Sequence, residues 1–319
     1  MVEADAVMDV NPVVIIAGPT ASGKTALALD IAAEFNGTVI NADSMQVYRE
    51  LRVLTARPGD DEEARTPHKL FGVLPASEIC SVGRWLTLAE AEIETAWKEG
   101  RLPLIVGGTG MYIRALVEGL AAIPEIPSAI NDEVRALYDE LGGEAFREEL
   151  AKLDGDAAER LPAGDSQRLT RAMAVVRATG KSLAHWQEEG KGPSLKARFL
   201  TIALVPGRED LYAACEARFE AMLENGAIDE VKALMALSLD ASLPAMKALG
   251  VPELGRQVNG EISLDEAADT AKQATRNFAK RQLTWLRNQV NADHVIEDFY
   301  RPAHRDQVAT AIRVFLEAG

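Results

Sequence analysis

Short runs of apolar residues alternate with helical patterns along this chain. Residues 13–17 form a β-branched apolar run that stops at a glycine, and a helical pattern follows over residues 24–35. Further strand patterns lie at residues 38–41, 102–106 and 199–205. Continuous apolar runs of this length are typical of strands buried on both faces. Their alternation with helices predicts an α/β fold, a parallel sheet flanked by helices.

The strand pattern disappears between residues 121 and 195. This segment opens with two prolines, is helical in pattern and ends in a Gly-Lys-Gly-Pro loop at residues 190–193. We therefore expect a helical insertion domain at residues 121–195. It interrupts a core expected to comprise residues 1–120 and 196–319, which is mostly helical in pattern after the last strand.

The segment Gly18-Pro-Thr-Ala-Ser-Gly-Lys-Thr25 lies between the first strand and the first helix. It fits G-x-x-x-x-G-K-[ST], the phosphate-binding loop, in the structural context that the motif requires. The glycines let backbone N–H groups converge on an anion, and the N-terminus of the helix adds positive potential. Lys24 supplies a mobile charge, and the Thr25 hydroxyl is placed to bind Mg²⁺. The loop predicts a di- or triphosphate site on a P-loop NTPase-like sheet.

The composition, and the motifs that the sequence lacks, narrow the range of possible reactions. The 319 residues carry a net charge of −15, which disfavours non-specific coating of nucleic acid but leaves room for a local basic groove. No run approaches the ~20 apolar residues that span a bilayer, and the two cysteines show no metal-ligand spacing. There is no N-K-x-D motif of GTPases, and the acidic run at 60–63 is interpreted as a solvated loop. A cytoplasmic enzyme is expected, and a small-molecule kinase remains an alternative.

Two polar turns follow strands of the expected sheet. Asp43 and Ser44 come directly after the second strand. Ligands of open parallel sheets bind outside the carboxyl ends of the strands, so both residues should face the phosphate loop. Capping of a following helix is a competing interpretation, and the two roles can coexist. Thr109, in the glycine-rich turn after the third strand, is either a ligand for phosphate or base or part of a tight turn.

The segment at residues 270–292 is basic and contains no acidic residue. At 100° per residue most of its charges share one stripe of a helix, opposite Phe278 and Trp285. A solvated amphipathic face is the usual interpretation, but the absence of acids favours contact with a polyanion. The basic residues are Lys272, Arg276, Lys280, Arg281 and Arg287. Within the insertion, Arg168 and Arg171 share a helix face that suits phosphate or base contacts as well as ion pairs.

Six motifs stand in a fixed order along the chain. They are GPTASGKT at 18–25, DSMQVY at 43–48, TARP at 55–58, GGTGMY at 107–112, DSQRLTRA at 165–172 and ATRNFAKRQLTWLR at 274–287. This set resembles the bacterial tRNA dimethylallyltransferases, also called tRNA isopentenyltransferases, over residues 13–288. The phosphate loop alone is unspecific, whereas the ordered set is highly specific. Leu54 and Val251 depart from the family, which often has glycine and an aromatic residue at these places.

The resemblance implies transfer of a five-carbon group from dimethylallyl diphosphate to N6 of the adenosine next to the anticodon, in tRNAs that read codons beginning with U. The phosphate loop then holds the diphosphate that is released. The implied catalytic residues are Asp43, as the base, with Lys24 and Thr109, and Mg²⁺ is the implied cofactor at Thr25. The implied diphosphate-binding residues are Gly18, Pro19, Thr20, Ala21, Ser22, Gly23, Lys24, Thr25 and Arg218.

The implied partner is the tRNA anticodon stem-loop, gripped by the insertion domain. The implied tRNA contacts are Asp43, Ser44, Met45, Gln46, Thr109, Arg135, Gln167, Arg168, Leu169, Thr170, Arg171, Arg276, Lys280 and Arg281. The insertion carries 14 acidic and 9 basic residues, a net charge of −5, so binding is expected to be strongly salt-sensitive. Nothing in the sequence requires a membrane or more than a monomer.

Overall fold

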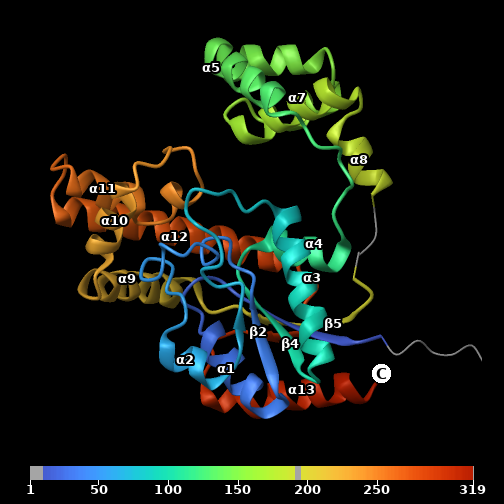
Figure 1. The fold of residues 1–319 in the computed structure, drawn as a ribbon, viewed down its shortest axis with the longest axis vertical. Coiled ribbons are helices and arrows are strands. Elements are labelled where there is room, and N and C mark those ends of the chain that lie inside the picture. The colour runs from blue at the N-terminus through green and yellow to red at the C-terminus, as the bar shows by residue number, and fades with distance from the viewer. Residues whose placement is uncertain (1–9, 191–194, 319) are drawn as a thin grey trace, which may run out of the picture. The chain divides into compact units, whose positions relative to one another are not determined.

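The structure is a computed structural model that describes residues 10–190 and 195–318 (Figure 1). The chain divides into two units. Met1–Val117 and Leu195–Gly319 form the core unit, and Glu118–Ser194 form the insertion unit. The loop expected at 190–193 lies outside the described residues except for Gly190.

The core unit is built on a sheet whose six strands are all parallel, in the order β3-β2-β4-β1-β5-β6. The strands are β1 (Pro12–Ala17), β2 (Gly37–Asn41), β3 (His68–Lys69), β4 (Leu102–Gly107), β5 (Arg198–Leu204) and β6 (His294–Ile296). The expected α/β fold class is confirmed. The edge strands β3 and β6 are too short to leave an apolar run in the sequence, and both were missed.

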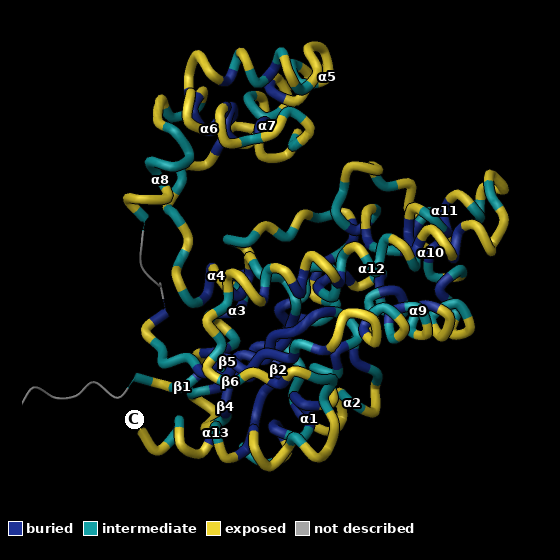
Figure 2. Tube along the Cα trace, turned by 180° about the vertical axis from the view of Figure 1, so that it is seen from behind, coloured by how far each residue is buried: buried dark blue, intermediate teal, exposed yellow. Residues whose placement is uncertain are grey.

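Alternate residues of the central strands enter two different cores. Val13 and Ile15 of β1 belong to the core on one face, and Val14 and Ile16 belong to the core on the other. A residue period of two sends neighbouring side chains to opposite faces, so a strand covered on both sides must be apolar throughout. The dark tube of the central strands in Figure 2 shows this burial.

Helices cover both faces of this sheet. On one face α1 (Lys24–Phe35) contacts β2 and β4 while α13 (Arg305–Glu317) contacts β5. On the other face lie α3 (Val82–Lys98) and α4 (Gly110–Glu118), and Trp85 of α3 stacks on Tyr112 of α4 with ring centroids 4.3 Å apart. The remaining core-unit helices are α2 (Asp60–Arg65), α9 (Arg208–Glu224), α10 (Ala227–Ala236), α11 (Val251–Val258), α12 (Leu264–Gln289) and the 3₁₀ turns at Ala245–Lys247 and Pro302–His304.

The helices α9 to α12 pack on one another beside the sheet, and α12 runs back across the ends of the strands (Figure 1). One expectation fails in this unit. The acidic run at residues 60–63 is not a loop, because it forms the first turn of α2, where four acidic residues stabilise the positive end of the helix dipole. The run is solvated as expected, since α2 buries none of its residues.

The insertion unit is helical and has its own apolar core. Its helices are α5 (Ser128–Ala151), α6 (Gly155–Arg160), α7 (Ser166–Thr179) and α8 (Leu183–Glu189). Phe146 and Leu150 of α5 pack with Leu169 and Met173 of α7. Gly142 breaks the regular path of α5 with a φ of 71°. Across the part of the chain that the structure describes, no helix is both long and apolar enough to cross a membrane.

Candidate active site

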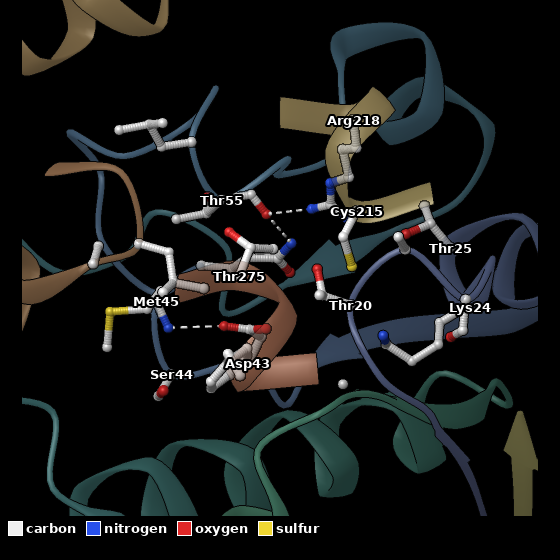
Figure 3. Close-up of a pocket in the computed structure, with 18 of the residues that line it drawn as sticks. Thr20, Lys24, Thr25, Asp43, Ser44, Met45, Thr55, Cys215, Arg218 and Thr275 are labelled. Atoms are coloured by element: carbon white, nitrogen blue, oxygen red, sulfur yellow. Dashed lines mark hydrogen bonds between the residues drawn. The ribbon is translucent and has the colours of Figure 1, made fainter. Parts of the chain in front are cut away.

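A cavity of about 350 Å³ opens in the core unit where the strands end. Lys24, Asp43 and Arg218 point into it from the phosphate loop, the turn after β2 and helix α9 (Figure 3). Because β1 and β2 are parallel, their carboxyl ends meet at one edge and bring the phosphate loop and the Asp43 turn together, while α9 adds Arg218. The cavity is lined in part by Thr20, Ala21, Ser22, Gly23, Lys24, Thr25, Asp43, Ser44, Met45, Gln46, Arg218 and Arg281.

The phosphate loop has the backbone conformation that its motif requires. Gly23 has a φ of 93°, where a side chain would be strained, and a Cβ there would lie 3.0 Å from Tyr300 Cβ. Ala21 has a φ of 64° although it is not a glycine. The Ser22 carbonyl accepts a hydrogen bond from the Tyr300 N–H at 3.1 Å. The segment after β6 therefore supports the loop from outside the motif.

The cations of the cavity are held partly out of water. The Lys24 ammonium donates to the Pro19 carbonyl at 2.7 Å, and burial lowers the Lys24 pKa to about 8, against the opposing effect of the Asp43 carboxylate. Burial also lowers the pKa of the Arg218 guanidinium and raises that of the Cys215 thiol. Desolvation disfavours a charge that lacks a counterion, so both cations are poised to gain from an anionic ligand.

Asp43 is fixed by its own turn and by Asn41. The Asp43 carboxylate accepts from the Met45 N–H at 2.9 Å. The fully buried Asn41 amide accepts from the Asp43 N–H at 2.8 Å and donates to the carbonyls of Asp43, at 2.9 Å, and Leu70, at 3.1 Å. The turn does not start a helix, so the capping interpretation of Asp43 and Ser44 is wrong. Its hydrogen bonds are those of an aspartate turn that aims the carboxylate at the cavity.

The turn at residues 51–58 is a second support of the site. Both oxygens of Glu230 in α10 accept backbone N–H groups, those of Arg52 and Val53 at 2.7 Å and that of Leu54 at 2.9 Å. The turn presents the Thr55 carbonyl, which accepts from Arg218 at 3.2 Å and from Gln46 at 2.9 Å. No motif in the sequence identifies Glu230, because its role depends on a contact across almost 180 residues.

Thr109 lies outside the set of residues that line the cavity. Its hydroxyl accepts from the Ser44 N–H at 2.9 Å and faces the Ser44 hydroxyl at 3.4 Å. Thr109 therefore contacts the turn that carries Asp43. Gly18 and Pro19 also lie behind the cavity wall, and a Cβ on Gly18 would come within 2.6 Å of the Ser22 hydroxyl.

The basic stripe of α12 is partly neutralised. Arg276 forms an ion pair with Glu216 of α9, and Lys272 pairs with Glu220 at 2.8 Å. The acids that balance these charges stand on a neighbouring helix, where the charge pattern of a single segment cannot show them. Lys280 is exposed, while Arg281 and the Phe278 ring beneath it line the cavity.

The remaining predicted tRNA contacts are in the insertion unit. Arg135 of α5 and Gln167, Arg168 and Arg171 of α7 are exposed. Arg168 lies 3.5 Å from the Asp165 carboxylate, which caps α7. Thr170 donates to the Ser166 carbonyl at 2.7 Å. Leu169 is fully buried in the unit's core, so its side chain anchors α7 and cannot contact a partner.

The cavity suits a magnesium ion that is bound jointly by the protein and by the phosphates of a ligand. The Thr25 hydroxyl lines the cavity and is an oxygen ligand of the kind that Mg²⁺ accepts. Among the residues that the structure describes, no cluster of three or more His, Cys, Asp or Glu side chains could enclose a metal by itself. Mg²⁺ commonly takes one or two protein ligands and completes its shell with water and substrate phosphates.

This fold and this site define a phosphate-loop enzyme of group transfer, with a carboxylate beside the cavity that the phosphate loop lines. The IPP transferase family model matches residues 46–289, and the isopentenyl transferase model matches residues 11–70. The chain belongs to the IPP transferase family.

Relatives of known sequence and structure agree with this assignment. The chain is 56% identical to a tRNA dimethylallyltransferase of Rhodospirillum centenum over 88% of its own length and 90% of the relative's. It resembles the crystal structure of a tRNA isopentenylpyrophosphate transferase of Bacillus halodurans with a TM-score of 0.69 and 31% identity, over 97% and 96% of the two chains. A eukaryotic dimethylallyltransferase acting on tRNA gives a TM-score of 0.80 at 25% identity, over 95% and 78%.

Proposed function

We propose that this chain transfers the dimethylallyl group of dimethylallyl diphosphate to N6 of the adenosine next to the anticodon of tRNA. Family membership supports the reaction, and one juxtaposition supports its location. The Asp43 carboxylate, Lys24 and Arg218 face a single cavity from three segments of the chain. The cations suit the diphosphate, and the carboxylate suits the amino group that attacks it.

In the proposed reaction a bond forms between N6 and the allylic carbon while the bond from that carbon to the diphosphate oxygen breaks. Asp43 takes the proton that N6 loses, since one carboxylate oxygen is held by the Met45 N–H and the other is left to accept it. Lys24, Arg218 and the loop amides stabilise the charge that develops on the leaving diphosphate. Mg²⁺, when bound at Thr25, neutralises further charge there.

The tRNA is proposed to meet both units. Adenine N6 must leave the base stack to enter an enclosed site, so the target base is expected to be flipped out. Gln46 beside the cavity, and Arg135, Gln167 and Arg171 on the insertion unit, are the proposed contacts, with Lys280 and Arg281 on α12. We place the reaction in the cytoplasm and treat the protein as a monomer.

The test of this proposal is Asp43→Asn. The asparagine oxygen still accepts from the Met45 N–H, so the turn persists while the base is lost. We expect kcat to fall about 10²–10⁴-fold, with the affinities for tRNA and dimethylallyl diphosphate changed less than about threefold. The product, N6-dimethylallyladenosine, is measured by mass spectrometry of tRNA nucleosides, and the two affinities are measured by titration.

The matched control is Asp61→Asn in the exposed first turn of α2, for which kcat should stay at the wild-type value. An Asp43→Asn protein with wild-type kcat contradicts the role of Asp43 as base. A wild-type protein that leaves tRNA unmodified but consumes ATP with a small acceptor is instead a kinase. Both reactions are therefore run in parallel.

A further inference from the structure

The inward face of α12 carries a buried amide that the reaction scheme above does not use. Gln282 is only 6% exposed. Its side-chain oxygen accepts from the Thr20 N–H of the phosphate loop at 2.8 Å, and its NH₂ group donates to the Gly108 carbonyl at 3.0 Å. Only this orientation of the amide satisfies both neighbours, because an N–H needs an acceptor and a carbonyl needs a donor.

Gly108 is shaped to receive this contact. A Cβ on Gly108 would lie 2.3 Å from the Gln282 nitrogen and 2.8 Å from the Gly18 carbonyl oxygen. No side chain fits there without displacing the phosphate loop or α12. One turn further along α12, Trp285 occupies the corresponding place at Gly110, where a Cβ would lie 2.3 Å from the indole ring. The two α12 side chains thus hold the residues on either side of Thr109.

Through this turn the contact reaches the acceptor side of the site. The Thr109 hydroxyl accepts from the Ser44 N–H at 2.9 Å, and the Thr109 N–H donates to the Ala42 carbonyl at 3.2 Å. Ala42 and Ser44 are the neighbours of Asp43. A continuous path of hydrogen bonds therefore runs from the phosphate loop through Gln282 and Thr109 to the turn that carries the proposed base.

We infer that Gln282 is a positioning residue that fixes the separation between the diphosphate loop and the Asp43 turn. The inference rests on the proposed function, because that separation decides whether N6 can attack the allylic carbon in line with the departing diphosphate. Misplacement of reacting groups by about 1 Å can cost ~10²-fold in rate while binding persists. Gln282 should therefore affect kcat more than KM.

The decisive measurement is a double-mutant cycle with Gln282→Met and Thr109→Ala, followed by kcat and by KM for dimethylallyl diphosphate. Methionine has nearly the same length as glutamine but neither donates nor accepts in this way. We expect Gln282→Met to lower kcat about 10–100-fold with KM within about threefold. In the Thr109→Ala background the same change should lower kcat by a smaller factor, because the hydroxyl link to Ser44 is already lost while the backbone link from Thr109 to Ala42 remains. The matched control, Gln289→Met at the exposed end of α12, should keep wild-type kcat.

Gln282→Glu tests the contact with the Gly108 carbonyl separately, and it replaces Gln282→Met if that variant does not fold. A glutamate still accepts from the Thr20 N–H but turns an oxygen toward the Gly108 carbonyl, so kcat should fall at least as far. Three results would each overturn the inference while leaving the proposed function intact. They are equal losses of kcat in both backgrounds, a rise in KM with unchanged kcat, and a Gln282→Glu variant with the kcat of the wild-type protein. A wild-type protein that forms no prenylated tRNA overturns the proposed function, and the inference with it.

Discussion

The phosphate loop and the turn that carries Asp43 lie on opposite sides of one cavity but are held in different ways. The loop combines local bonds, from the Ser22 N–H and the Lys24 ammonium to the Pro19 carbonyl, with bonds to the distant residues Gln282 and Tyr300. The Asp43 carboxylate is held by its own turn, but that turn and the neighbouring turn at residues 51–58 depend on partners far along the chain. Thr109 holds Ser44, and Glu230 holds the turn at residues 51–58.

This difference separates what a motif encodes from what a fold supplies. A loop whose geometry comes from its own glycines keeps its chemistry wherever a strand and a helix flank it. A turn that depends on distant side chains holds its carboxylate in place only in the complete structure. The two sides should therefore respond differently to substitutions outside the cavity.

Among the substitutions that test this comparison, Glu230→Gln is expected to have the largest effect. In Glu230→Gln one acceptor oxygen is replaced by an NH₂ group that faces backbone N–H donors, so at least one of the amides of Arg52, Val53 and Leu54 loses its partner. Hydrogen bonds to a charged group contribute about 1.5–3 kcal/mol, and we expect a loss of roughly that size in the free energy of unfolding. Arg218 loses its fixed carbonyl partner, so KM for dimethylallyl diphosphate should rise about tenfold.

Urea unfolding and steady-state kinetics measure these two changes. Asp229→Asn is the matched control on α10, because its ion pair with Lys232 is exposed and should contribute less than about 0.5 kcal/mol. If Glu230→Gln behaves like Asp229→Asn, the turn at residues 51–58 is held by its own bonds. The contrast between the two sides of the cavity would then be lost.

Sequence reasoning predicted the elements whose cause is local. The phosphate loop, the four long strands and helix α1 at residues 24–35 each follow from contiguous patterns, and the structure has them within one residue. The position of Asp43 beside Lys24 also followed, because parallel strands place their carboxyl ends at one edge. These features required only periodicity, a motif and a topological rule.

The features that sequence reasoning missed depend on contacts between distant segments. Glu216 neutralises Arg276 from another helix, and Leu169 is buried although its neighbours Arg168 and Thr170 are not. The helical period of α7 could have placed Leu169 on the inner face, whereas no local pattern could have identified Glu230 or Gln282. The strands β3 and β6 form only because longer strands offer them an edge.

A smaller effect, on the phosphate-loop side, is a pH dependence of diphosphate binding. Burial lowers the Lys24 pKa to about 8, so the free protein loses this charge as the pH rises through that value. A bound diphosphate favours the protonated form, so affinity should be constant below pH 8 and fall up to about tenfold per pH unit above it. Titration of inorganic diphosphate between pH 7 and 9.5 measures this, with Lys24→Arg as the control.

Arginine stays protonated throughout this range, so the Lys24→Arg curve should show only the ionisation of diphosphate itself, even if its affinity is lower. A wild-type curve parallel to the Lys24→Arg curve would mean that Lys24 remains charged in the empty site. Any change common to both proteins belongs to the ligand or to another group. Only an additional fall in the wild-type protein assigns the effect to Lys24.

The smallest expected effect, on the free energy of unfolding, tests whether the residues of the phosphate loop determine its conformation by themselves. Ala21 has a φ of 64°, a left-handed conformation that costs a residue with a Cβ roughly 1 kcal/mol more than glycine. Ala21→Gly removes that strain but increases the freedom of the unfolded chain, so we expect a net stabilisation of about 0.5 kcal/mol, measured by calorimetry. Ala26→Gly in α1 should have the opposite sign, because glycine destabilises a helix by about 1 kcal/mol. Destabilisation by both substitutions would show that contacts outside the loop, such as that of Tyr300 with Ser22, impose the conformation of Ala21 and compensate for it.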